Sequence, residues 1–292
     1  MFKWFLLNHY VEEIQYCQLY NHLTLSKRAL MDSFIFQLFI CWFFIAIFMV
    51  LLWAIQLKTD NAAIADVGWA YGIVFGVLYF SFIGDGNKER IVLTATLAVI
   101  WGLRLGTYLL VNRVINVKED SRYLNFRKSA GRNIRRYFFL FFQAQAVVAI
   151  LFIIPICIVF YNSKQLNYID IIAIIVWLLS MVGECVADKQ LSNFKSNIAN
   201  QGKVCQKGLW KYSRHPNYFF EWIHWWSYVL LNLGSNNIWI SISGPIIMLF
   251  FLIKVSGVPF AEQQSLKSKG IEYKKYIETT NMFFPWLPKD RI

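Results

Sequence analysis

The sequence is poor in the side chains that hold metals and form disulfides. Among its 292 residues are 5 Cys and 4 His. The cysteines are scattered without a CxxC pair, so the sequence indicates neither a zinc site nor a disulfide framework. Four histidines are too few for a histidine-box hydroxylase, and the ExxH pair of Glu221 and His224 lacks the second copy that a di-iron bundle requires. We predict no metal site, and we expect His224 to pack among aromatic residues at the membrane interface.

Motifs of soluble nucleotide-binding and hydrolase folds are also missing. The sequence has no GxGxxG after a strand, no GxxxxGK[ST] and no GxSxG. A Rossmann domain, a P-loop and an α/β-hydrolase are therefore unsupported. Any nucleotide would have to be held by helices.

Charged residues make up only 16% of the chain, whereas 57% is hydrophobic and the mean hydropathy is +0.43. A bilayer suits such a composition, and crossing it takes roughly 20 apolar residues, which are helical because lipid offers no partners for backbone amides. Seven apolar segments have about this length: 33–57, 67–83, 91–112, 137–161, 168–187, 218–233 and 237–257. We predict an all-α integral membrane protein of about seven transmembrane helices, forming a single domain over residues 31–292.

The net charge of +12 comes largely from Lys and Arg in the links between apolar segments. These residues form no stripe with interleaved aromatics, so we expect no nucleic-acid partner. The three most basic links follow the third, fifth and seventh segments and fall on one side of a seven-helix arrangement. The positive-inside rule assigns that side to the cytosol, which places the N-terminus outside and the C-terminus in the cytosol.

Residues 1–30 lack the pattern of a signal peptide, because Glu12, Lys27 and Arg28 break up the apolar start. We expect either an interfacial amphipathic helix or an upstream extension, since Met31 directly precedes the first long apolar segment.

Polar residues gather where the fifth segment ends. Glu184 and Asp188 are four residues apart and project from one helical face. Carboxylates near the end of a spanning helix are costly unless they face a polar cavity or a partner. A solvated helix end is the structural alternative.

A second polar run covers residues 208–222. Pro216 pre-sets the first turn of a helix whose free amides point toward the cytosol, where an anion can bind. Arg214 supplies a planar fork for phosphate, and Asn217 and Glu221 share a helical face. This run predicts a phosphate and ribose site.

The first half has two ionisable residues in or beside apolar segments, Asp66 and Arg104. An intramembrane carboxylate is a functional hypothesis by default, and a guanidinium is its obvious partner. A buried salt bridge between the second and third helices is the structural alternative.

Four motifs carry a family resemblance: Trp101-Gly102-Leu103-Arg104-Leu105, Ala187-Asp188-Lys189-Gln190-Leu191, Asn200-Gln201-Gly202-Lys203, and the run Gly208 to Trp222 centred on Tyr212-Ser213-Arg214-His215-Pro216-Asn217-Tyr218. With these motifs the chain resembles the steroid 5-alpha-reductase-like family of bacterial integral membrane proteins over roughly residues 60 to 288. Its RHPxY-like core is similar, more loosely, to those of sterol reductases and isoprenylcysteine carboxyl methyltransferases.

In that family the C-terminal half binds NADPH, whose hydride goes to a carbon–carbon double bond conjugated to a ketone. The resemblance implies that the tail from Glu262 to Tyr276 closes over the nucleotide, and that the protein lies in a bacterial inner membrane. Motif positions and the polar runs together give these candidate cofactor-binding residues: Glu184, Asp188, Lys195, Asn200, Lys203, Tyr212, Arg214, His215, Asn217, Tyr218, Glu221, Glu262, Tyr273 and Tyr276.

The N-terminal half departs from the family pattern. Steroid reductases use a Glu and a Tyr on helices two and three to polarise the 3-keto oxygen, and the corresponding places here look like Asp66 and Trp101. A carboxylic acid could donate to a ketone in an apolar pocket, but an indole cannot act as an acid, which puts a 3-ketosteroid substrate in doubt. The candidate catalytic residues are Asp66, Trp101 and Arg104.

We therefore expect an NADPH-dependent reductase of a double bond in a steroid, sterol-like or other enone lipid, which enters through a cleft among the first four helices. Two alternatives stay open: an S-adenosylmethionine-dependent methyltransferase of a lipid or prenyl cysteine, and a non-catalytic lipid-binding membrane protein. Lys and Arg around the site favour a phosphate-rich cofactor.

Overall fold

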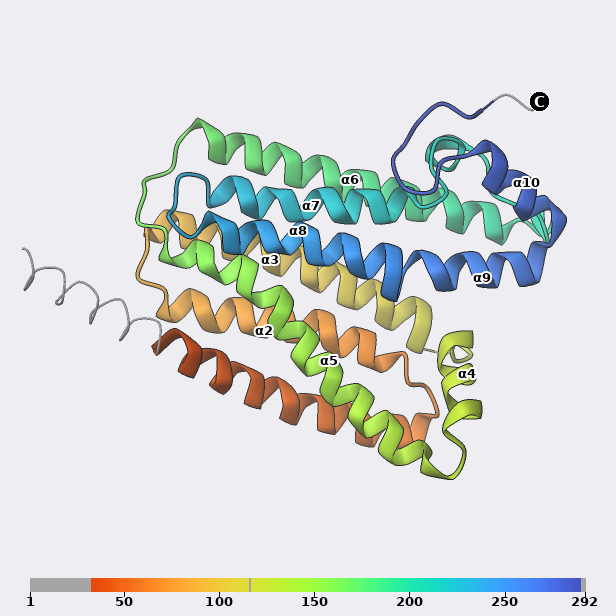
Figure 1. The fold of residues 1–292 in the computed structure, drawn as a ribbon, viewed down its shortest axis with the longest axis horizontal. Coiled ribbons are helices and arrows are strands. Elements are labelled where there is room, and N and C mark those ends of the chain that lie inside the picture. Colours follow the sequence, from red (N-terminus) through yellow and green to blue (C-terminus); the bar gives the residue numbers. More distant parts are fainter. Residues whose placement is uncertain (1–32, 116, 290–292) are drawn as a thin grey trace, which may run out of the picture.

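The protein is built from helices that run side by side along one long axis (Figure 1). The computed structural model describes residues 33–115 and 117–289, and no strand occurs within these ranges. The all-α prediction is confirmed. The expectation for residues 1–30 lies outside the described residues.

The helices follow one another as a first helix at Ser33–Thr59, α2 at Ile64–Ile83, α3 at Lys88–Leu109, α4 at Ser121–Ala130, α5 at Ile134–Cys157, α6 at Tyr168–Ser196, α7 at Pro216–Leu231, α8 at Ile238–Phe250, α9 at Val258–Lys269 and α10 at Ile271–Thr279. A π-helical turn extends α3 over Leu110–Val114, and a second extends α8 over Phe251–Val255. Both turns lie where a helix approaches the same end of the molecule (Figure 1).

Six helical stretches in the described ranges are long and apolar enough to cross a membrane: Ser33–Thr59, Ile64–Ile83, Lys88–Val114, Ser121–Tyr161, Tyr168–Ser196 and Ile238–Lys269. The protein is thus an integral membrane protein by length and composition. The predicted segment 218–233 becomes α7, which has 16 residues and therefore spans only about 24 Å at 1.5 Å per residue. It lies between α6 and α8 and is shorter than α6 (Figure 1).

Glycine residues let neighbouring helices approach closely, both at α6–α7 and at α2–α3. A Cβ atom on Gly183 of α6 would lie 2.4 Å from the Phe220 ring of α7, and one on Gly102 of α3 would lie 2.5 Å from Val74 of α2. In lipid there is no hydrophobic driving force between helices, so van der Waals contact at such close approach helps to hold them together.

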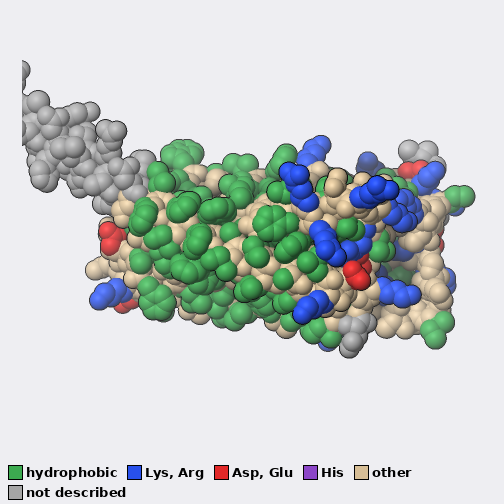
Figure 2. Space-filling view, turned by 90° about the horizontal axis from the view of Figure 1, so that it is seen from below, with side chains coloured by type: hydrophobic (Ala, Val, Ile, Leu, Met, Phe, Trp, Pro, Cys, Tyr) green, Lys and Arg blue, Asp and Glu red, His purple; other side chains and the backbone are tan. Residues whose placement is uncertain are grey.

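The surface separates into an apolar belt and one basic end. Figure 2 shows hydrophobic side chains over the middle of one face and Lys and Arg gathered toward the end where α4, α9 and α10 lie. We call this end the basic end. The links after α3 and α6 and the segment after α8 all reach it (Figure 1), as the sequence predicts. Its assignment to the cytosol stays a prediction.

The opposite end is closed by one buried arginine. Arg90 near the start of α3 forms an ion pair with Asp170 of α6 and also donates to the carbonyl of Leu231 at the end of α7. Its remaining donors reach the carbonyls of Lys164 at 3.2 Å and Gln165 at 3.0 Å. One side chain therefore joins α3, α6 and α7 at this end.

Candidate functional site

Three helices, α3, α6 and α7, meet around buried polar side chains between the apolar belt and the basic end. Arg104 of α3 forms an ion pair with Glu184 of α6. Trp101, one turn earlier on α3, donates its Nε1–H to Oε2 of Glu221 on α7 at 2.9 Å. We call this group the three-helix polar cluster, and its members are Trp101, Arg104, Glu184, Asp188, Asn217 and Glu221.

The spacing of these residues along each helix explains why they meet. Glu184 and Asp188 are four apart on α6, as are Asn217 and Glu221 on α7, so each pair lies on one helical face. The close contact of α6 with α7 at Gly183 brings the two faces together. The sequence predicted each pair, and the structure joins them to Trp101 and Arg104.

Glu221 is fully engaged with aromatic donors. Its exposed fraction is 7%. Oε1 accepts from the Trp225 indole at 3.2 Å, and Oε2 accepts from Trp101. Glu184 is the carboxylate that forms the ion pair with Arg104. The sequence reasoning missed Trp225, although its i+4 spacing from Glu221 places it on the same face.

His224 continues this network away from the basic end. Its ring stacks on Trp101 with centroids 4.8 Å apart, and its Nε2 lies 2.8 Å from the Tyr228 hydroxyl. Its Nδ1 has no hydrogen-bond partner among the described residues. The expected packing among aromatics is confirmed, but His224 is 1% exposed. It therefore lies in the protein interior instead of at the membrane interface.

Toward the basic end the cluster offers unused acceptors. Asn217 donates its amide to Oδ1 of Asp188 at 3.1 Å. The Asn217 carbonyl oxygen is buried and finds no partner in the described part of the chain. An unsatisfied buried acceptor calls for an explanation, and a hydroxyl or amide of a ligand would supply its partner.

The last turn of α6 and the loop that follows it carry exposed basic side chains. Lys195 ends α6 and Lys203 follows in the loop, and both are exposed without an ion-pair partner in the described ranges. Asn200 lies between them, but its amide donates to the Phe194 carbonyl at 3.0 Å. Asn200 thus shapes the loop, while the two lysines are available to an anion.

Arg214, predicted to be a phosphate fork, uses its Nε and Nη1 donors within the protein. Its Nε donates to Glu262 at 2.8 Å, and its Nη1 donates to the carbonyls of Thr280 at 2.6 Å and Ile277 at 3.2 Å. The Glu262 carboxylate on α9 and the backbone carbonyls of α10 and the tail therefore accept from donors that the sequence predicted for a ligand. Arg214 acts as a clamp that holds the C-terminal segment on the start of α7.

His215 belongs to the same clamp. Its Nε2 lies 3.3 Å from Oε1 of Glu262, and its ring stacks on Tyr218 with centroids 5.3 Å apart. Burial lowers the pKa of His215 below its ordinary value of 6.5, against the opposing effect of the Glu262 carboxylate. The neutral imidazole is therefore favoured in the folded protein.

The tail tyrosines face the protein instead of an open site. The Tyr276 hydroxyl donates to the carbonyls of Trp210 and, at 3.1 Å, Ser213. Tyr273 is also buried, and burial raises its pKa to about 12. Tyr212 stays partly exposed beside them. The tail does close over the loop before α7, but through contacts that leave Tyr276 no free hydroxyl.

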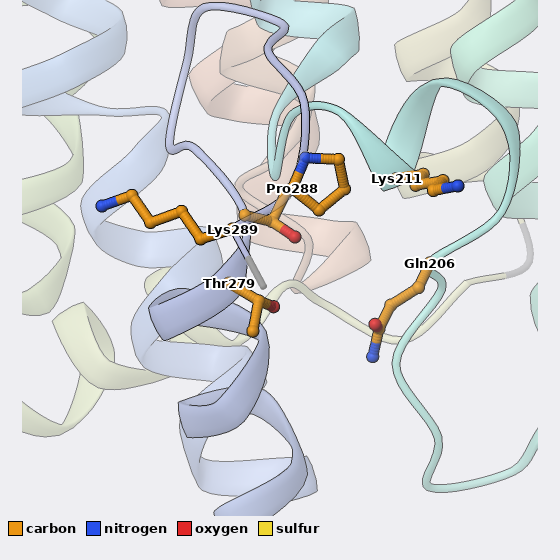
Figure 3. A pocket seen from close by; sticks show the side chains of 6 residues that line it. Gln206, Lys211, Thr279, Pro288 and Lys289 are labelled. Carbon is orange, nitrogen blue, oxygen red and sulfur yellow. The ribbon is translucent and has the colours of Figure 1, made fainter. Parts of the chain in front are cut away.

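A pocket of about 230 Å³ lies between this loop and the tail (Figure 3). The sequence reasoning did not foresee it. Figure 3 shows Lys211 and Lys289 pointing in opposite directions, so these two ammonium groups do not converge on one ligand. Its lining residues are Gln206, Lys211, Thr279, Thr280, Pro288 and Lys289.

Asp66 lies apart from the three-helix polar cluster. It accepts from the Tyr123 hydroxyl at 2.7 Å, from Arg122 at 3.1 Å and from Arg113 at 3.4 Å. The expected pairing with Arg104 is wrong. Because α2 and α3 are antiparallel, the start of α2 is level with Arg113, whereas Arg104 lies nine residues, or about 14 Å, further along α3. We call Asp66, Arg113, Arg122 and Tyr123 the Asp66 cluster.

Aromatic side chains fill the space between α2, α3, α5 and α7. Trp69 lies 5.3 Å from Phe152 by ring centroids, Phe152 lies 5.0 Å from Trp225, and Trp225 lies 5.5 Å from Trp101. A substrate cleft among the first four helices therefore stays a prediction.

Comparison with known proteins places the chain among uncharacterised relatives. It is 24% identical over 270 residues to a Schizosaccharomyces pombe protein named "Uncharacterized protein C594.04c", a match that covers 81% of this chain and 76% of that protein. No solved structure matches. A family described as "Protein of unknown function (DUF1295)" matches residues 52–280. That range contains every candidate catalytic and cofactor-binding residue, and because it covers most of the chain, the protein belongs to the DUF1295 family.

Proposed function

We propose that this protein is a membrane-embedded NADPH-dependent reductase of a carbon–carbon double bond in a steroid, sterol-like or other enone lipid, of the steroid 5-alpha-reductase type. The observation that carries the proposal is the half-buried Asp188–Asn217 pair. It retains an unsatisfied acceptor, the exposed Lys195 and Lys203 lie between its two residues along the chain, and it lies one helical turn from the buried carboxyl groups of Glu184 and Glu221.

The residues present fit a dinucleotide in their chemistry. Lys195 and Lys203 can neutralise phosphates. Asp188 and Asn217 can accept hydrogen bonds from ribose hydroxyls, and the Asn217 carbonyl has this capacity unused. NADPH, when bound, would supply the hydride, and the protein would position it and exclude water. Trp101 and Glu221 are hydrogen-bonded to each other on the side of the three-helix polar cluster that faces away from the basic end.

Asp66 takes a different role from the one expected. Its carboxylate accepts from two guanidiniums and a hydroxyl, so neighbours on the π-helical extension of α3 and on α4 already use both of its oxygens. We therefore propose that Asp66 joins α2, the end of α3 and α4, and that it acts on turnover only through their positions.

One observation favours the methyltransferase alternative. Arg214 donates to Glu262 on α9 and to the Thr280 carbonyl, so fewer cationic donors remain for phosphate than the sequence suggests. S-adenosylmethionine carries no phosphate, so this would not weaken its binding. A non-catalytic lipid-binding protein is favoured in turn by the aromatic filling between α2, α3, α5 and α7.

Thermal unfolding of the detergent-purified protein separates these possibilities. A ligand at a hundred times its dissociation constant stabilises the folded state by about 2.7 kcal/mol. We expect NADPH to raise the unfolding midpoint of the wild type. Replacing Lys195 and Lys203 by Gln should remove most of this shift, whereas Lys274→Gln with Lys275→Gln, two exposed lysines on α10, should leave it intact.

Stabilisation by S-adenosylmethionine alone would overturn the reductase in favour of the methyltransferase. Stabilisation by NADPH without oxidation of the cofactor in the presence of any enone lipid would favour a binding protein.

A further inference from the structure

The link between α3 and α5 carries two populations of basic side chains. The first is paired. Arg122 lies 3.1 Å from Asp66 and 3.1 Å from Asp120, and Arg127 lies 2.6 Å from Glu119. Arg113 completes the group beside Asp66. These inner arginines use all the carboxylates that the link and the start of α2 offer.

The second population has no carboxylate partner within the described ranges. It occupies the end of α4 and the start of α5, and all its members are exposed. We call it the outer basic face: Lys128, Arg132, Arg135 and Arg136. Asp60, in the loop before α2, is 87% exposed and pairs with Arg127 at 3.8 Å.

The outer basic face adjoins the apolar belt. Directly after Arg136, Tyr137 and Leu140 are exposed, with fractions of 43% and 57%. Trp53 on the first helix donates its indole N–H to the Arg135 carbonyl at 3.2 Å and stacks edge-on against Phe139 at 5.3 Å. Basic side chains above a Trp and a Tyr at the rim of an apolar surface are typical of the membrane–water interface.

Figure 2 shows how basic and hydrophobic side chains adjoin on one face of the molecule. Lys and Arg side chains begin where the hydrophobic side chains end, with no broad uncharged zone between them. A lipid whose acyl chains lie against the apolar belt therefore presents its headgroup at the level of these cations.

We propose that the outer basic face is a binding site for the phosphate of anionic phospholipid headgroups in the leaflet at the basic end. Arginine matches phosphate with a planar fork of donors, and an anionic leaflet attracts each such side chain. A nucleic acid fits less well, because exposed apolar side chains border the cations and that border lies in lipid. The site is independent of the proposed reductase activity.

The experiment is a lipid titration monitored by thermal unfolding. The wild type in zwitterionic detergent micelles receives increasing amounts of either phosphatidylglycerol or phosphatidylcholine. Phosphatidylglycerol should raise the unfolding midpoint and phosphatidylcholine should not. Because the lipid phosphate is attracted electrostatically, 0.5 M NaCl should weaken the response.

The test variant replaces Arg132, Arg135 and Arg136 by Gln. Each basic side chain near an anionic surface contributes roughly fivefold in affinity, so the half-saturating phosphatidylglycerol concentration should rise at least tenfold. The matched control removes three exposed charges from α9 and α10, Lys267, Lys274 and Lys275, also by Gln. It should respond as the wild type does.

An unchanged response of the test variant would overturn the proposal, as would an equal loss in the control, which would mean diffuse attraction without a site. An equal shift with inorganic phosphate or with RNA oligonucleotides would assign the face to a soluble anion or to nucleic acid. If the triple variant does not fold, Arg132→Gln alone provides the test, because Arg132 lies in the short link before α5 and is exposed.

Discussion

The Asp66 cluster and the three-helix polar cluster are both built from buried or half-buried carboxylates and arginines near the same end of the bundle, but their hydrogen-bonding groups are satisfied to different degrees. Asp66 has two guanidiniums and a hydroxyl as donors. In the three-helix polar cluster Glu184 pairs with the one guanidinium of Arg104, Glu221 accepts from two indoles, and nearby atoms of Asn217 and His224 have no partner in the described chain. A cluster whose donors and acceptors all have partners joins helices. A cluster that keeps buried polar atoms without partners lowers stability, and a ligand that bonds to those atoms could complete it.

The largest expected effect comes from breaking the ion pair of the three-helix polar cluster. Arg104→Met should lower the free energy of unfolding by about 3 kcal/mol, because it leaves Glu184 buried without its cation. Adding Glu184→Leu should restore much of that loss, since no unpaired charge remains. Denaturant or thermal unfolding in detergent measures both variants, and a double variant as unstable as the single one would refute this account.

A smaller effect should follow from weakening the Asp66 cluster. Asp66→Asn keeps the shape and can still bond to Tyr123, but it loses the charge that pairs with Arg122 and Arg113. We expect a loss of about 2 kcal/mol in unfolding free energy with an unchanged NADPH-induced shift of the unfolding midpoint. If the variant stays as stable as the wild type but loses turnover, Asp66 belongs to the reactive site and the contrast between the two clusters fails.

The smallest effect should come from the clamp beside both clusters. Because burial lowers the pKa of His215 in the folded protein, its neutral form contributes stability that is fully present above the unfolded value of about 6.5. That contribution should be lost progressively as the pH falls below 6.5. His215→Gln should flatten the pH dependence of the unfolding midpoint between pH 7 and pH 5, and an equal slope in the variant would contradict this assignment.

The sequence predicted the helices well because length and hydropathy decide which segments can enter a bilayer. It also predicted the faces of α6 and α7, since residues four apart share a face. It failed at partners between helices. Whether Asp66 meets Arg104 or Arg113 depends on which turns of antiparallel helices are level.

Arg214 shows a second limit of sequence reasoning. Its main partners are backbone carbonyls, at Thr280 and Ile277, and every residue has a carbonyl. A contact to a backbone carbonyl therefore leaves no mark in the sequence. The same holds for Asn200, whose amide donates to the Phe194 carbonyl.

The buried Arg90 at the opposite end has a consequence for biosynthesis. Its ion-pair partner Asp170 is 80 residues further along the chain, and the Leu231 carbonyl is 141 residues further. At a synthesis rate of about 5 to 20 residues per second, the ribosome needs roughly 7 to 28 s after making Arg90 to complete its partners. During that interval the Arg90 guanidinium on α3 lacks its full set of partners, so α3 reaches its final position in the bundle only after α7 has been synthesised.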